Sequence, residues 1–188
     1  MPAPTARAHA QLVQLRDLAQ RHYRDVYDYD ESRFALVSNV PRAWQGPGEP
    51  IALEAIRGPG INVAGFLRHD GTDFHAYATT ESLKSVDIIL FFHDFCQNLT
   101  QPTIVVLDNA STHTSAAFKA QIPVWVEQGM TLFYLPPYSP ELNRIEILGR
   151  GCKHQWLPPK AYRNFAALKH ELRILFTKVG HECKIAFA

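Results

Sequence analysis

This sequence of 188 residues has few cysteines and no long apolar run. Its three cysteines, Cys96, Cys152 and Cys183, lie far apart and form no CxxC pair, so reduced thiols are expected rather than a disulfide framework. The strongest apolar run, IILFF at 88–92, is too short to span a membrane. Because the N-terminus also lacks an apolar signal core, we expect a cytoplasmic protein with no membrane partner.

Several catalytic motifs are missing as well. There is no Walker loop for nucleotide phosphates, and the serines lack the nucleophile elbow of serine hydrolases. Cys152 and His154 stand two residues apart without the further ligands that a zinc site needs. The length of 188 residues is enough for one well-cored domain, and the hydrophobic content of 46% and charged content of 20% are ordinary for a globular protein.

Charge is unevenly distributed, although the formal net charge is only +1. Residues 144–188 carry nine Lys and Arg against three Asp and Glu, a net of +6. Residues 1–143 carry ten against fifteen, a net of −5. This asymmetry fits an acidic site beside a basic end that binds a polyanion. Taken alone, it favours the simpler interpretation of a solvated helical face.

Hydrophobic periodicity and turn residues predict one mixed α/β domain. Helices are expected at 6–26, at 80–98 with Thr80 as N-cap, at 115–129, and on both sides of Leu157-Pro158-Pro159. Strands are expected at 26–38, 51–56, 61–70, 73–79, 103–108 and 131–135, with a loop at 41–50. The run TIVVLD at 103–108 is apolar up to its last residue, which is typical of a strand buried on both faces.

Two aspartates stand out against this pattern. Asp108 ends the buried strand, at the edge where open α/β sheets commonly bind ligands. Taken alone, Asp108 is better explained as a cap of the following turn or helix. Asp30 lies in YDYDES, where it shares strand parity with Asp28, whereas Glu31 points to the other face. Acids are poor strand formers, so Asp30 marks either a site or an exposed strand edge.

A third acid, Glu146, ends the stretch LPPYSPELNRIE at 135–146. Its three prolines favour a stiff extended path. Asn143 and Glu146 match a capping box, which accounts for Glu146 without any chemistry. A rigid loop and a first helical turn also hold a carboxylate in place, as metal binding requires. Carboxylates from separate elements suit magnesium, and two such ions support phosphoryl transfer.

The blocks DESRF, TIVVLDNASTH and LPPYSPELNRIEIL together resemble the signature of DDE-superfamily transposases, in particular the mariner-related bacterial insertion-sequence family. The 37 residues between Asp108 and Glu146 agree with that pattern. The resemblance implies a ribonuclease-H-like fold, a mixed five-stranded sheet with flanking helices. It also implies DNA cleavage by water, then strand transfer by a freed 3′-hydroxyl, as in DNA transposition and recombination.

The resemblance assigns the metal-binding catalytic acids to Asp30, Asp108 and Glu146, with two magnesium ions that manganese can replace. Asp108 is expected to bridge both ions. The expected partners are transposon ends, target DNA and further copies of the chain, at the bacterial nucleoid. The candidates for DNA binding are Asn109, His113, Arg150, Lys153 and His154. A local packing role for His113 and a plain solvated face for the basic residues remain alternatives.

The sequence also departs from the family pattern. Arg144 stands where Pro is usual, Arg33 where Gly is common, and Gly149 close to a usual Trp. Pro is preorganised for a helix start and each interior Gly costs about 1 kcal/mol, so Arg144, Gly149 and Gly151 predict a loosened Glu146 helix.

Residues 1–25 are expected to form a helical lead-in and 26–188 the catalytic domain. The helix-turn-helix domain that family members carry before it is expected to be absent, or supplied as a separately encoded half. One alternative is a truncated, non-catalytic remnant that binds DNA or a full-length transposase. Another is a general ribonuclease-H-like nuclease, against which LPPYSPELNRIE argues.

Overall fold

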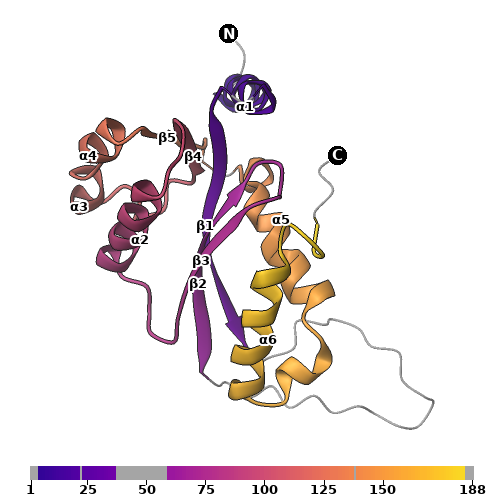
Figure 1. Cartoon of the computed structure of the whole chain (residues 1–188). Coiled ribbons are helices and arrows are strands. Elements are labelled where there is room, and N and C mark those ends of the chain that lie inside the picture. The colour runs from indigo at the N-terminus through magenta and orange to yellow at the C-terminus, as the bar shows by residue number, and fades with distance from the viewer. Residues whose placement is uncertain (1–3, 22, 37–58, 138, 185–188) are drawn as a thin grey trace.

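The computed structural model describes residues 4–21, 23–36, 59–137 and 139–184 (Figure 1). Its strands are β1 (Asp25–Ala35), β2 (Gly60–Arg68), β3 (Phe74–Thr79), β4 (Thr103–Leu107) and β5 (Met130–Tyr134). Its α-helices are α1 (Pro4–Gln20), α2 (Ser85–Gln97), α3 (Ala116–Lys119), α4 (Ile122–Glu127), α5 (Arg144–Gly151) and α6 (Phe165–Lys178). Other helical turns are η1 (Pro140–Leu142), η2 (Cys152–Trp156) and η3 (Pro159–Tyr162).

The strands form one mixed sheet in the order β3-β2-β1-β4-β5. β2 is antiparallel to both β1 and β3, whereas β4 is parallel to both β1 and β5. Every residue of β4 is buried, as expected for a central strand with helices on both faces. The predicted mixed five-stranded sheet is therefore confirmed.

Helices cover both faces of this sheet (Figure 1). α2, α3 and α4 lie on one face over an aromatic core that includes Tyr29, Phe66, Phe92 and Trp125. α5 and α6 lie on the other face over a core that includes Phe34, Leu148, Leu168 and Leu172. α1 lies at one end of the sheet, where Leu12 packs with Val26 and Ile104. Within the described residues, three buried clusters therefore pack around one sheet.

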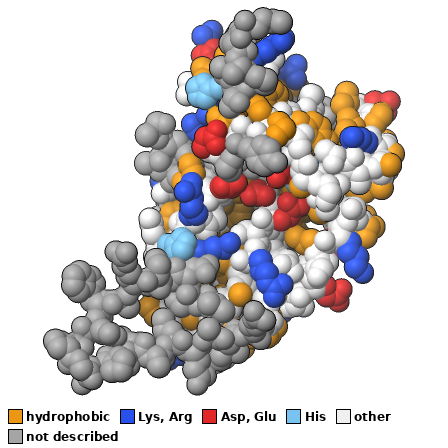
Figure 2. All heavy atoms as spheres, turned by 180° about the vertical axis from the view of Figure 1, so that it is seen from behind, with side chains coloured by type: hydrophobic (Ala, Val, Ile, Leu, Met, Phe, Trp, Pro, Cys, Tyr) orange, Lys and Arg blue, Asp and Glu red, His pale blue; other side chains and the backbone are white. Residues whose placement is uncertain are grey.

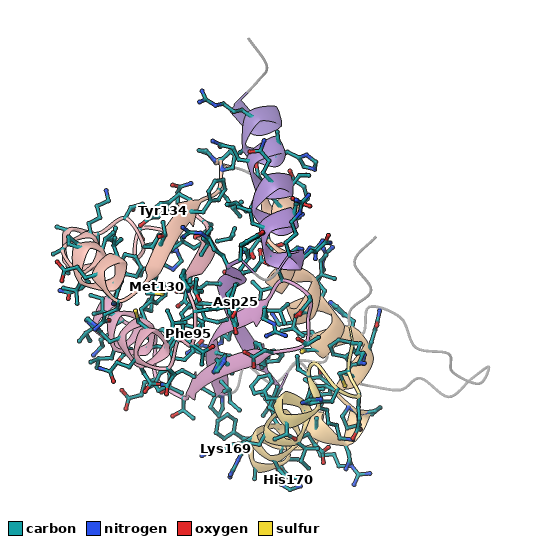
Figure 3. The ribbon with its side chains drawn as sticks, turned by 45° about the horizontal axis from the view of Figure 1, so that its top comes forward. Asp25, Phe95, Met130, Tyr134, Lys169 and His170 are labelled. Atoms are coloured by element: carbon teal, nitrogen blue, oxygen red, sulfur yellow. The ribbon has the colours of Figure 1, made fainter. Side chains whose placement is uncertain are left out.

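Figure 3 shows the same division between core and surface in the side chains. Phe95 on α2 and Met130 on β5 lie between helices and sheet, with 4% and 0% of their surface exposed. Lys169 and His170 on α6 point into solvent. Over the described ranges, no helix combines the length and the apolar character that a membrane span needs.

Two helices differ from the prediction at one end: α1 at its C-terminus and α2 at its N-terminus. α1 ends at Gln20, because the chain joins the sheet at Asp25, whose N–H donates to the Pro102 carbonyl at 3.0 Å. α2 begins at Ser85, so the prediction of Thr80 as N-cap is wrong. The Lys84 N–H donates to the Asp87 carboxylate at 2.9 Å, and this contact sets the start of the helix.

The helix predicted at 115–129 is two short helices. Ser115 caps α3 by accepting the Phe118 N–H at 3.3 Å. Pro123 has no N–H to continue the hydrogen-bond ladder of α3, and a new helix begins at Ile122. The predicted strands at 61–70 and 73–79 are confirmed as the pair β2 and β3. The predicted loop at 41–50 and strand at 51–56 lie outside the described residues.

The segment after 143 is helical on both sides of Leu157-Pro158-Pro159, as predicted. α5 forms in spite of Gly149 and Gly151 and continues into the π-helical turn η2. A Cβ at Gly151 would lie 3.3 Å from the ring of Trp156. Glycine at this position therefore lets the indole pack close to the helix backbone.

Candidate active site

The first two acids lie where β1 and β4 separate. These parallel strands are paired from Asp25 with Thr103 to Asp28 with Val106. Asp30 lies two residues beyond the last pair, where β1 is paired with β2 alone, and Asp108 directly follows β4. Both residues therefore lie just past the carboxyl edge of the parallel pair. Asp108 thus has the predicted position, and Asp30 lies within a strand.

The loop before α5 is attached beside Asp108. The Leu135 N–H donates to the Leu107 carbonyl at 2.8 Å, so the chain leaves β5 next to the end of β4. The Asn109 amide donates in turn to the Leu135 carbonyl. Asn109 therefore anchors this loop, and its contact with DNA stays a prediction.

Asn143 is the N-cap of α5, as predicted, but the predicted capping box does not form. The Asn143 side chain makes no capping hydrogen bond. Instead its Nδ2 donates to the Tyr29 carbonyl on β1 at 3.1 Å, and the residue is buried. This contact ties the start of α5 to the residue before Asp30. Helix capping by Asn143 therefore does not account for the position of Glu146.

Arg144, the first residue of α5, also binds the sheet. Its Nη1 donates to the His69 carbonyl, just beyond β2, at 2.7 Å. Burial, together with the charge of Arg16, lowers the pKa of Arg144 to about 10, while the charge of Asp28 acts in the opposite direction. A side-chain contact therefore fastens the helix at the position where loosening is predicted from the missing proline.

Asp30, Asp108 and Glu146 line one cavity of about 320 Å³. Its other walls include Asn109 and Asn143. Figure 2 shows acidic side chains gathered near the middle of one face of the molecule, with Lys and Arg side chains around them. Three elements thus bring the three predicted acids to the same cavity.

The negative charges of Asp108 and Glu146 act on Asp30 across this cavity. Burial is the largest of the effects that raise the pKa of Asp30 to about 7. The Glu31 N–H donates to Asp30 Oδ1 at 2.8 Å, and this hydrogen bond lowers the pKa of Asp30. The charges of Glu31, Asp108 and Glu146 raise the same pKa. A bound cation would relieve this repulsion.

These oxygen donors suit a hard divalent cation such as magnesium. Within the described part of the chain, no group of three or more His, Cys, Asp or Glu side chains is arranged to hold one metal ion. The carboxylates of Asp30, Asp108 and Glu146 share one cavity, so their oxygens are the donors there that fit such a cation.

His113 lies beneath Asp108 and is 0% exposed. Its Nδ1 is 2.8 Å from Asp108 Oδ1, and its Nε2 is 3.0 Å from Glu31 Oε1. Burial lowers the pKa of His113, but the hydrogen bonds and charges of Glu31 and Asp108 outweigh burial and raise it. A buried ring with both nitrogens engaged does not reach DNA. The predicted DNA contact is thus corrected for His113 in favour of the local alternative.

Two of the basic candidates lie beside the acids. Arg150 and Lys153 border a second cavity of about 270 Å³, which Asp30 and Glu146 also border. Lys153 Nζ lies 5.3 Å from the centre of the Phe34 ring. His154 is exposed and borders neither of these two cavities. Arg150 and Lys153 are thus well placed to contact a polyanion that enters the acidic cavity.

Two contacts at the site have no counterpart in the sequence-based expectations. Strand parity sets Glu31 on the face opposite Asp30, but it carries no signal for its partner His113, 82 residues away. Asn143 fits a local capping pattern, and that pattern conceals its contact with Tyr29, 114 residues away.

Three solved structures with related folds are similar to this chain. The Mos1 transposase paired-end complex with left transposon end matches with a TM-score of 0.62 at 15% identity, over 92% of this chain and 53% of that one. The catalytic domain of Mos1 mariner transposase gives 0.54 at 13% identity, over 92% and 78%. The catalytic core domain of BIV integrase gives 0.51 at 11% identity, over 86% and 86%. These likenesses show the ribonuclease-H-like fold.

At the level of sequence, uncharacterized protein y4pE/y4sA of Sinorhizobium fredii (strain NBRC 101917 / NGR234) is 31% identical over 62 residues, 33% of this chain and 42% of that protein. This chain thus spans about half the length of the relatives named first. The sequence profile of the DDE superfamily endonucleases matches residues 25–169, a range that contains all three acids and the five strands. The chain therefore belongs to the DDE superfamily endonuclease family.

Proposed function

We propose that this chain is a transposase catalytic domain that cleaves DNA strands and transfers them with the help of divalent metal ions. The convergence of Asp30, Asp108 and Glu146 on one cavity carries the proposal, in a chain of the DDE endonuclease family. In the proposed reaction, water attacks a phosphodiester at the transposon end and leaves a 5′-phosphate and a free 3′-hydroxyl. This 3′-hydroxyl then attacks a phosphodiester of the target, bonds to its phosphorus and displaces the target's own 3′-oxygen.

The proposed cofactor is magnesium, which manganese can replace, bound as two ions. Asp108 would contact both ions, and Asp30 and Glu146 would each complete one of the two sites. When bound, such ions activate the attacking oxygen and stabilise the leaving oxygen. Solved paired-end complexes of Mos1 contain Mg or Mn, which supports this choice.

The remaining candidates are proposed to hold the DNA. Arg150, Lys153 and His154 follow Glu146 along the chain and would bind backbone phosphates. Asn109 would contribute a further polar contact at the cavity wall. A positive rim around an acidic centre suits DNA, because phosphates approach the rim while metal ions neutralise the centre.

The proposed partners are transposon ends, target DNA and a second copy of the chain. Mos1 forms a paired-end complex with transposon-end DNA, and this supports self-association by analogy. Sequence-specific recognition of the ends would come from a helix-turn-helix part outside residues 1–188 or from a separate polypeptide. The protein would act where its DNA is, at the bacterial nucleoid in the cytoplasm.

Nicking of supercoiled plasmid by the purified chain with Mn²⁺ tests the proposal. The wild type should nick the plasmid, and Asp108→Asn should be at least about 100-fold slower, because metal ions contribute several kcal/mol to such reactions. Asp94→Asn, an exposed aspartate on α2, is the matched control and should nick like the wild type.

A non-catalytic remnant is the alternative that this assay distinguishes. The absence of a closed three-acid group in the described residues is the observation that favours it. If neither wild type nor Asp108→Asn nicks DNA and neither binds Mn²⁺, the chain is such a remnant. Mn²⁺ binding without nicking would mean that a DNA-binding partner is missing.

A further inference from the structure

The buried ring of His113 approaches Asp108 from the sheet face opposite α5. The ring of His113 packs against Tyr29 and Phe118, with centroid distances of 5.4 Å and 5.8 Å. Both aromatic residues belong to the core beneath α2. Asp30 and Glu146 lie toward the opposite face of the sheet, where α5 packs. Asp108 is therefore approached by His113 from one face and by the other two acids from the other.

A series of hydrogen bonds links Tyr29, Glu31 and His113 to Asp108. Tyr29 Oη donates to Glu31 Oε1 at 3.2 Å, and the same oxygen lies 3.0 Å from His113 Nε2. Because an ionised carboxylate only accepts, the ring nitrogen is the donor in this contact. Tyr134 Oη donates to the His113 carbonyl at 3.0 Å and fixes the backbone as well. Packing and hydrogen bonds therefore hold the ring in one orientation.

Asp108 depends on these contacts for its orientation. Its side chain is 54% exposed, so packing alone does not hold it. Oδ1 lies 2.8 Å from His113 Nδ1 and accepts the Ala110 N–H at 2.9 Å. None of the described residues donates a hydrogen bond to Oδ2. One oxygen is thus fixed by the protein, and the other remains available.

We propose that Glu31 and His113 are positioning residues for the metal ligand Asp108. Glu31 orients the His113 ring, and His113 holds Oδ1 so that Oδ2 is presented to the ions. Glu31 also follows Asp30 directly, so the contacts of His113 link the middle of β1, beside Asp30, to Asp108, which follows β4. This inference rests on the proposed function, because it concerns the geometry of that metal site.

Three substitutions separate the parts of this arrangement. Asn at position 113 can offer an amide donor near the position of Nδ1, toward Asp108. Gln can offer one near the position of Nε2, toward Glu31. His113→Asn should therefore keep more of the wild-type Mn²⁺ affinity than His113→Gln. Glu31→Gln removes the charge that orients the ring and keeps the size of the side chain.

Two matched controls lie elsewhere in the fold. His93 also uses both ring nitrogens, with Nε2 3.2 Å from Gln121 Oε1 and Nδ1 accepting the Trp125 indole N–H at 3.2 Å. His93→Gln therefore disturbs a comparable histidine away from the acids. Glu171 forms a half-buried ion pair with Lys160 at 2.7 Å, so Glu171→Gln is the control for loss of a carboxylate.

The experiment measures Mn²⁺ affinity of the full chain from the electron paramagnetic resonance signal of free Mn²⁺, beside the thermal unfolding midpoint of each variant. Substitutions of residues that hold metal ligands typically cost about 10- to 100-fold in metal affinity. Glu31→Gln and His113→Gln should show a loss in this range, and His113→Asn a smaller one. Both controls should keep wild-type affinity, even where their unfolding midpoint falls.

Other outcomes overturn the inference. Wild-type Mn²⁺ affinity in folded Glu31→Gln and His113→Gln would leave both residues a structural role only. Equal losses for His113→Asn and His113→Gln would contradict the orientation of Asp108 through Nδ1. If His113→Gln does not fold, Glu31→Gln decides, because that side chain is 24% exposed. If the wild type binds no more Mn²⁺ than Asp108→Asn, the proposed function fails, and the inference with it.

Discussion

Asp28 and Asp30 lie on the same face of β1, yet their surroundings differ. Asp28 is paired with Val106 in the sheet and is 1% exposed, and its Oδ2 lies 3.9 Å from His69 Nδ1. Asp30 lies beyond the last pair of β1 with β4 and lines the acidic cavity. The divergence of two strands, rather than residue type, separates a buried carboxylate from a candidate metal ligand.

A second carboxylate with an altered pKa lies at the start of β3 and controls stability rather than chemistry. His75 Nε2 is 3.0 Å from Asp73 Oδ2, and the Tyr27 hydroxyl donates to the same oxygen at 2.6 Å. The His75 hydrogen bond is the main reason that the pKa of Asp73 is lowered to about 2, and it also raises the pKa of His75.

These pKa shifts predict how stability depends on pH. The contribution of Asp73 is present above its ordinary pKa of 3.8 and is lost as pH falls toward 2. The contribution of His75 is complete below its ordinary pKa of 6.5 and is lost as pH rises through its raised value. Urea unfolding should therefore show the largest destabilisation by Asp73→Asn near pH 5. A pH-independent difference between Asp73→Asn and wild type would contradict this.

At this scale, local patterns in the sequence reach only part of the site. Asp30 and Asp108 are predictable because strand parity and the end of a buried run are local features. The contact of Glu31 with His113 spans 82 residues and depends on how β1 and β4 separate. No periodicity carries that information.

At the scale of elements, α5 is held to the sheet by its first residues. The Asn143 amide donates to the Tyr29 carbonyl, and the Arg144 guanidinium donates to the His69 carbonyl. These contacts fix the turn that carries Glu146, so that loop stiffness from the prolines is only one of the causes of its position. The prolines bring the chain to the sheet edge, and the tethers set the helix on it.

Asn143→Ala tests this tether. It removes a buried hydrogen bond and leaves the Tyr29 carbonyl without its donor, so we expect a loss of about 1–3 kcal/mol in unfolding free energy. Mn²⁺ affinity should fall as well, because Glu146 loses its fixed distance from Asp30. Urea unfolding and Mn²⁺ titration measure the two effects.

Asn164→Ala is the matched control for that substitution. Asn164 caps α6 by accepting the Ala167 N–H at 2.8 Å, and its loss should cost about 1 kcal/mol. Its Mn²⁺ affinity should equal that of the wild type. If both variants lose similar stability and neither loses Mn²⁺ affinity, then Asn143 stabilises the fold without positioning Glu146.

For the whole molecule, the periodicity of the sequence predicts a mixed α/β domain but not the order of its strands. β4 is recognisable because helices on both faces require an apolar residue at every position. The order β3-β2-β1-β4-β5 follows from pairings between distant segments, which periodicity does not reveal. The resemblance of three motif blocks to a known family predicts only that the sheet is mixed and has five strands. The ends of α2 and the division between α3 and α4 depend on single side chains, and the periodicity of apolar residues misses them.

The uneven charge also acts at this scale, and it gives a prediction about DNA. Arg150 and Lys153 border the cavity beside the acids, whereas Lys169 on α6 points into solvent (Figure 3). Log affinity falls as log salt concentration rises, and each lost phosphate contact should make this slope shallower by about 0.9. We expect this change for Arg150→Ala and Lys153→Ala in fluorescence anisotropy with a labelled duplex, and none for Lys169→Ala. Equal effects of all three substitutions would mean that net charge, rather than a defined rim, attracts the DNA.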